Sequence, residues 1–100
     1  MNSTEILLFT RELTTEKNEI YELEYYITVD YLCFGNDLLL ENYGLMVCKE
    51  NQGKGVSAEC SSVRSLTTNY DKIEKLAKIL HENEVTPVTL KDIVDDVLAA

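Results

Sequence analysis

The sequence predicts an α+β fold: a four-stranded antiparallel meander followed by two C-terminal helices packed on one face, in the order ββββαα. Apolar residues alternate with polar ones in the first two thirds of the chain, as in half-buried strands. In the last third they recur every three or four residues, as in amphipathic helices. We expect one domain over residues 1–100, with strands at about 5–13, 19–33, 43–50 and 55–64 and helices at about 69–82 and 89–98.

The clearest strand begins near Tyr21. Its odd positions are apolar or aromatic through Tyr31, whereas its even positions are mostly polar, so one face should lie in the core. Segments rich in turn-forming residues separate the strands, at 14–18, 35–37 and 51–55. Such short connections favour antiparallel neighbours.

The length of the turn after Phe34 decides which side of the next strand enters the core. A two-residue turn would place alternate residues from Leu40 to Cys48 there, whereas a turn of three or five residues, or one with a bulge, would place Tyr43, Leu45 and Val47 there. We favour the second register because it is more apolar. The run Leu38–Leu40 fits neither register, and we expect a loop that folds back on the sheet edge or, alternatively, a partner contact.

The first helix should bury a stripe that includes Leu76 and Leu80. Its start is marked by polar residues at 67–69, where Thr68 and Asp71 have capping-box spacing. Glu74 and Lys78 have the spacing of an ion pair on an exposed helix face. The helix should end near residue 83, an asparagine that tolerates the left-handed turn of a helix end.

A Thr-Pro elbow should separate the two helices. Pro87 disfavours helical geometry at Thr86, and Thr89 begins the second helix with Asp92 as its capping-box partner. We expect Val85 and Val88 to cover the bottom of the core. Alternatively, the elbow presents a docking surface with Thr86 and Lys91 exposed.

Charge and composition limit the partners. The formal net charge of −9 disfavours binding to nucleic acid or to anionic membranes. The N-terminus lacks a secretory pattern and no apolar run is long enough to cross a bilayer, so we expect a cytosolic protein. Cys33, Cys48 and Cys60 are odd in number and widely spaced, which disfavours a disulfide framework or a thiolate metal site; we expect buried apolar cysteines.

No catalytic constellation is evident. His81 is the single histidine, and we expect it to be a partly exposed residue near the end of its helix. Asp92, Asp95 and Asp96 could approach a divalent cation, but no neighbouring loop supplies further oxygens, so a solvated acidic face is the better interpretation. We expect no metal and no cofactor.

Three functional hypotheses remain. The first is a small acidic module for protein–protein interaction or regulation, without catalysis, which binds a protein partner or a second copy. The second is a ligand-binding protein or enzyme with a pocket between helices and sheet, near Tyr21, Tyr25, Tyr31 and Tyr70. The third is an acidic antirepressor that mimics nucleic acid. The candidate partner surface for the first comprises Tyr26, Leu38, Leu39, Met46, Cys48, Thr86 and Lys91.

Several short motifs, together with the order of elements, also carry a family resemblance. They are Tyr25-Tyr26, Tyr43-Gly44-Leu45, Leu66-Thr67-Thr68 and the segment NEVTPVTLKDIVDD at 83–96. The chain resembles, over nearly its whole length, a family of short proteins of unknown function from clostridia and related anaerobes. The resemblance implies a cytosolic stand-alone protein and provides no catalytic residues. Leu38–Leu40, Cys48 and Cys60 do not match that family's pattern.

Overall fold

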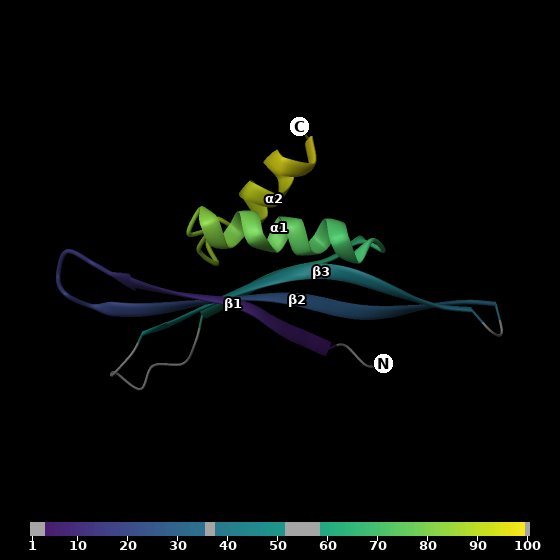
Figure 1. The fold of residues 1–100 in the computed structure, drawn as a ribbon, viewed down its shortest axis with the longest axis horizontal. Helices are drawn as coiled ribbons and strands as arrows, with labels where there is room; N and C mark the ends of the chain where they lie inside the picture. The colour runs from purple at the N-terminus through teal and green to yellow at the C-terminus, as the bar shows by residue number, and fades with distance from the viewer. Residues whose placement is uncertain (1–3, 36–37, 52–58, 100) are drawn as a thin grey trace.

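The computed structural model describes residues 4–35, 38–51 and 59–99, and it confirms the ββββαα fold. Four strands form one antiparallel sheet in the order β1-β2-β3-β4, and two helices follow (Figure 1). The strands are β1 (Thr4–Thr14), β2 (Ile20–Phe34), β3 (Leu38–Asn51) and β4 (Glu59–Thr67), and the helices are α1 (Tyr70–Glu82) and α2 (Leu90–Ala99). None of the helices in the described residues is long and apolar enough to cross a membrane.

The register between β2 and β3 is the one that we favoured. Val29 lies opposite Tyr43 and Ile27 lies opposite Leu45, because three residues separate Phe34 from its partner Leu38. The expected loop at Leu38–Leu40 is wrong: these residues begin β3, which therefore starts five residues before the expected position 43. The expected start of the fourth strand at 55 lies outside the described residues.

The core lies between the helices and one face of the sheet, which we call the front face. The strand residues on this face alternate as the sequence predicted, and α1 lies across them (Figure 1). α2 contacts β4. Burial of these apolar side chains is the main stabilising term of the fold. The buried core comprises Leu23, Tyr25, Ile27, Val29, Tyr43, Leu45, Val47, Ile73, Leu76, Ala77, Leu80, Val85, Leu90 and Val94.

β4 lies close against the backbone of β3 at Gly44. The register of this pair shifts between Tyr43 and Leu45, and Ser65 of β4 adopts a positive φ of 59° there. A Cβ on Gly44 would overlap the carbonyl oxygen of Val63. The Tyr43-Gly44-Leu45 motif therefore has a structural explanation, since a residue without a side chain is needed opposite the irregularity.

The start of α1 differs from the expected capping box. Asn69 is the N-cap, and its side chain accepts a hydrogen bond from the Lys72 amide at 3.1 Å. Asn69 can do this because it lies one residue closer to the helix than Thr68. The expected ion pair between Glu74 and Lys78 is also replaced, because Lys78 lies 4.0 Å from Glu82 instead.

The end of α1 is a Schellman motif. The Val85 amide donates to the Leu80 carbonyl at 3.0 Å, and the Glu84 amide donates to the His81 carbonyl at 3.3 Å. Glu84, not Asn83, adopts the left-handed conformation, with φ of 52°. Val85 and Leu80 are both buried, which supplies the apolar contact that accompanies this motif.

The elbow corrects two further expectations. Val88 is 77% exposed, and Pro87 is buried in its place. The Thr89 amide donates to the Thr86 carbonyl at 3.1 Å, and the Thr89 hydroxyl accepts from the Thr86 amide at 3.2 Å. The threonine pair therefore closes the turn itself, in place of a reciprocal bond between Thr89 and Asp92.

The cysteines contradict the prediction that all three are buried thiols. Cys48 and Cys60 lie directly opposite each other on β3 and β4 and form a disulfide bond, whereas Cys33 is a free, exposed thiol. The three cysteines therefore form one disulfide and leave one free thiol, which is why their odd number was misleading. Because disulfides are rare in reducing compartments, the cysteines give no support to the expected cytosolic location.

Candidate interaction surfaces

The β2–β3 hairpin extends beyond both outer strands, and we call its end the arm (residues 30–34 and 38–42). β1 pairs with β2 only as far as Val29, and β4 pairs with β3 only from Tyr43, among the described residues. The hairpin also reaches past the end of α1 (Figure 1). The outer part of the arm, at residues 32–33 and 38–41, is exposed, whereas at its base Asn42 is buried, Tyr31 packs against the core and Asp30 contacts Arg64 of β4.

Exposed leucines dominate this arm. Leu38 is 56% exposed and Leu39 57%, so both are available to a partner, as the candidate surface required. Leu32 and Leu40, opposite each other in the ladder, are 37% and 38% exposed. Apolar residues project from both faces of the arm, because Leu39 occupies the alternate position to Leu38 and Leu40.

Both carboxylates of the arm have partners within the chain. Asp30 accepts a hydrogen bond from Arg64 at 3.1 Å, and Glu41 accepts one from the Tyr43 hydroxyl. The hydrogen bond to Glu41, with burial, raises the pKa of Tyr43 to about 12. Arg64 therefore offsets the charge of Asp30, whereas Glu41 keeps its negative charge because its partner is a neutral hydroxyl.

The back face of the sheet, opposite the helices, provides a smaller surface than expected. Tyr26 and Met46 lie opposite each other on this face and are partly exposed. Cys48 is only 5% exposed and bonded to Cys60, so it cannot contact a partner in this form. The sequence could not reveal this, because the pairing depends on the register of β4.

At the elbow, the two candidate residues differ. Thr86 is only partly exposed and is hydrogen bonded to Thr89, so its polar groups serve the turn. Lys91 is exposed at the start of α2. The structure does not bring either residue next to the arm, since the elbow follows the other end of α1 (Figure 1).

A groove that the sequence analysis missed lies between β1 and α1. It has a volume of about 440 Å³ and is lined by Leu8, Phe9, Glu74, Lys75 and Lys78. A bulge in β1 at Leu8 turns both Leu8 and Phe9 toward the helix side. The signal in the sequence was the apolar run at residues 6–9, but its helical partners lie more than sixty positions away.

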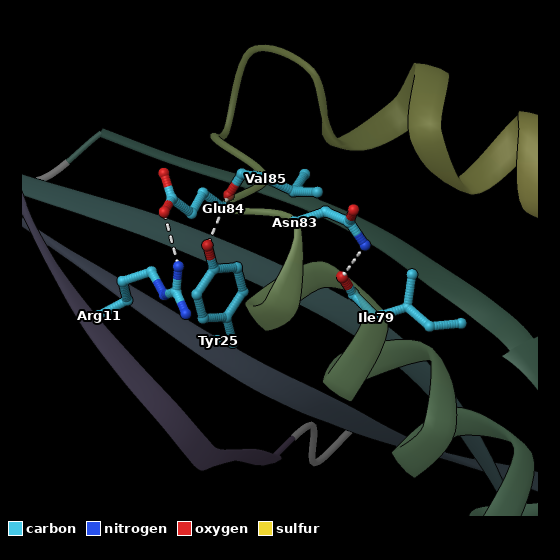
Figure 2. A network of polar contacts seen from close by, with 6 residues as sticks. All are labelled: Arg11, Tyr25, Ile79, Asn83, Glu84 and Val85. Atoms are coloured by element: carbon cyan, nitrogen blue, oxygen red, sulfur yellow. Dashed lines mark hydrogen bonds and ion pairs between the residues drawn. The ribbon is translucent and has the colours of Figure 1, made fainter.

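A polar network fastens one end of α1 to β1 and β2 (Figure 2). Arg11 forms an ion pair with Glu84 at 2.6 Å, and the Tyr25 hydroxyl donates to the Val85 carbonyl at 3.0 Å. Burial raises the pKa of Tyr25 to about 12, with Arg11 lowering it and Glu84 raising it further. Asn83 completes the network by donating to the Ile79 carbonyl at 2.7 Å.

His81, the one histidine of the chain, contacts Tyr25 of this network. Its ring stacks on Phe9 at 4.8 Å between centroids and meets the edge of Tyr25 at 5.8 Å. The imidazole is partly buried, so its position matches a packing role late in the helix. We assign it no catalytic role.

A second groove lies between the end of α1 and α2, with a volume of about 360 Å³. Its lining is Ile79, Asn83, Glu84, Val85, Thr89, Ile93, Asp96 and Val97. Neither groove is lined by Tyr21, Tyr25, Tyr31 or Tyr70, the residues considered for a ligand pocket. Tyr25 is fully buried in the core, and Tyr70 contacts Tyr43 edge to face.

Three carboxylates gather on the back face. The oxygens of Glu22, Glu24 and Glu50 lie within 4.8 Å of one another, which is a spacing that could hold a divalent cation. Burial, followed by repulsion from Glu50 and Glu22, raises the pKa of Glu24. The cluster arises because Glu22 lies opposite Glu50 in the ladder, so it could not be read from the sequence without the register.

The fold and these surfaces define a small α+β protein that presents apolar and mixed contact surfaces outside its core. The model of DUF6514, a family of unknown function, matches residues 4–100, and the chain belongs to this family. This confirms the resemblance to an uncharacterised family. No curated protein and no solved structure matches the chain.

Proposed function

We propose that this protein is a non-catalytic protein-interaction module that associates with a second copy through the arm. The observation that carries the proposal is the group of exposed leucines on a hairpin end that extends, among the described residues, past the pairing of β1 and β4. Contiguous exposed apolar surface of this kind is typical of interaction sites. A second copy offers the same apolar surface, which is what a two-fold symmetric contact requires.

The charges of the arm limit how two copies can meet. A chain of net charge −9 repels its own copies at long range, so any dimer contact must keep unpaired carboxylates apart. Asp30 and Glu41, the two acids of the arm, are engaged by Arg64 and Tyr43 within one chain. Among the described residues of the arm, only Asp30 has a cation as its partner, so a contact between the leucines of two arms must keep their Glu41 side chains apart.

Sedimentation velocity across a range of concentrations tests the proposal. We expect the wild-type protein to reach twice its chain mass of 11.4 kDa. The double variant Leu38→Ser, Leu39→Ser should remain a monomer, since both side chains are more than half exposed and contribute little to the fold.

Val88→Ser is the matched control, because Val88 is exposed but lies on the elbow. It should dimerise like the wild type, and circular dichroism should show that all variants are folded. A wild-type protein that stays monomeric at every concentration contradicts the proposal. So does an arm variant that dimerises as tightly as the control.

A further inference from the structure

We propose that the groove between β1 and α1 binds an extended segment of a partner protein, added to the sheet beside β1, whose groove-facing side chains include both apolar residues and carboxylates. This surface is separate from the arm. The proposal does not depend on dimer formation.

The edge of the sheet provides the backbone groups. β1 pairs with β2 on one side only, so its outer N–H and C=O groups have no strand neighbour among the described residues. Ile6 and Leu7 on this strand are 39% and 48% exposed. An uncovered apolar edge strand is the usual template for addition of an extended peptide.

The groove beside that edge provides side-chain contacts. Leu8 and Phe9 form its apolar floor, and both project toward α1 because of the bulge in β1. An extended peptide directs alternate side chains to opposite faces of the sheet, so every second residue would face this groove. Apolar residues there would cover the floor.

The charge of the groove determines which further side chains of the peptide face it beside the apolar ones. The helix residues that line the groove are two lysines, Lys75 and Lys78, and one acid, Glu74. This side of the groove therefore carries a net positive charge, although the protein as a whole is strongly acidic. Lys75 has no ion pair with any residue that the structure describes, and Lys78 has only an exposed pair with Glu82 at 4.0 Å. Such exposed pairs are weak, so both ammonium groups are available to carboxylates of a ligand.

The far end of the groove is held in place before binding. Arg11, two positions beyond Phe9, is paired with Glu84 and ties β1 to the end of α1 (Figure 2). Phe9 is also stacked on His81 of the helix. Strand and helix are therefore fixed relative to each other, which lowers the ordering cost of binding.

Nuclear magnetic resonance of the ¹⁵N-labelled protein tests the inference. The probe is a short, end-blocked peptide with threonine at every second position and with valine and glutamate in turn at the positions between, so that both face the groove. Its control has lysine in place of glutamate. We expect the acidic peptide to shift the amide signals of Thr4–Thr14 and to slow their hydrogen exchange. The lysine peptide should bind at least about tenfold more weakly, because it meets like charge.

Charge reversal provides the matched test. Lys75→Glu with Lys78→Glu should exchange the preference of the protein from the acidic to the basic peptide. Lys91→Glu, an exposed lysine on α2, changes the net charge by the same sign but should leave the preference unchanged. If the double reversal fails to fold, Lys75→Gln with Lys78→Gln should still weaken binding of the acidic peptide.

Three results would overturn the inference. The first is equal binding of the two peptides by the wild type, and the second is binding that survives both charge variants. The third is a response confined to the lysines with no change at β1, which would indicate surface attraction without strand addition. The arm variant Leu38→Ser, Leu39→Ser should bind the acidic peptide normally, so failure of the dimer proposal is distinguishable.

Discussion

The same two strands, β2 and β3, have very different surroundings at their centre and at the arm. Ile27 and Leu45 at the centre are 0% and 1% exposed, whereas Leu38 and Leu39 at the arm are more than half exposed. The difference is one of length. β2 has 15 residues, or about 50 Å of strand, whereas the 13 residues of α1 span about 20 Å. A helix of this size covers only part of the sheet, so apolar side chains beyond its end remain available for contacts.

The largest expected effect compares these two regions directly. Ile27→Ala should lower the free energy of unfolding by about 2–5 kcal/mol, because it leaves a cavity under α1. Leu39→Ala should change it by less than about 0.5 kcal/mol, because its side chain is mostly in solvent. Urea unfolding of dilute protein measures both. Similar losses for the two variants would mean that the arm is covered in solution.

The second prediction concerns the back face of the sheet, where a disulfide bond and not a helix stabilises the strands. Cys48 and Cys60 join β3 to β4 across positions 12 apart, on the face without helices. Cys60→Ser should lower the free energy of unfolding by about 2–4 kcal/mol, mainly because the unfolded chain regains freedom. Cys33→Ser is the control and should be neutral, since Cys33 is exposed and unbonded. Thermal unfolding with and without a reducing agent checks the result, and the agent should affect only proteins that retain both Cys48 and Cys60.

In the part of the sheet that α1 covers, a variant of Tyr25 tests the hydrogen bond that holds the end of α1 to β2. Tyr25→Phe should cost about 1–2 kcal/mol, because the buried Val85 carbonyl loses its donor. The folded pKa of about 12 exceeds the ordinary value of 10.0, so the folded state holds this proton more tightly. That contribution to stability is complete below pH 10 and is lost as pH rises toward 12. The variant should therefore lose stability less steeply over this range. Equal slopes for variant and wild type in alkaline urea titrations would contradict the assignment.

The smallest expected effect lies on the back face. Glu24→Gln should raise the free energy of unfolding at neutral pH by about 0.5 kcal/mol, because it relieves repulsion from Glu50 and Glu22. The folded pKa is raised, so the wild type loses stability as pH rises through and above 4.5. The difference between variant and wild type should vanish at lower pH. Glu16→Gln, an exposed position, is the control for a general charge effect in thermal unfolding.

Much of the fold could be predicted because each signal was local. The alternation around Tyr25 and the helical stripe through Leu76 gave the element types, and the apolar character of Tyr43, Leu45 and Val47 gave the correct register. The helix ends were predicted less well. Glu84 takes the left-handed turn assigned to Asn83, because the buried position of Val85 sets where the Schellman motif falls.

The candidate surfaces were predicted only in part. Leu38 and Leu39 were named as a possible partner contact, and they are exposed, but their strand conformation was missed because they precede the regular alternation. Cys48 was named as a surface residue and is buried in a disulfide. Its partner could not be inferred, because the pairing depends on the register between β3 and β4, which the sequence pattern did not give.

The sequence by itself determined the elements, their order and the inward face of the long strand, because the spacing of apolar residues reports burial along one element. Tertiary structure alone decided which distant residues meet. It joined Leu8 to Lys75 in a groove, Cys48 to Cys60 in a bond and Glu22 to Glu50 in a cluster. These contacts depend on bulges, register and the limited length of α1, which are properties of packed elements and leave no periodic signal in the chain.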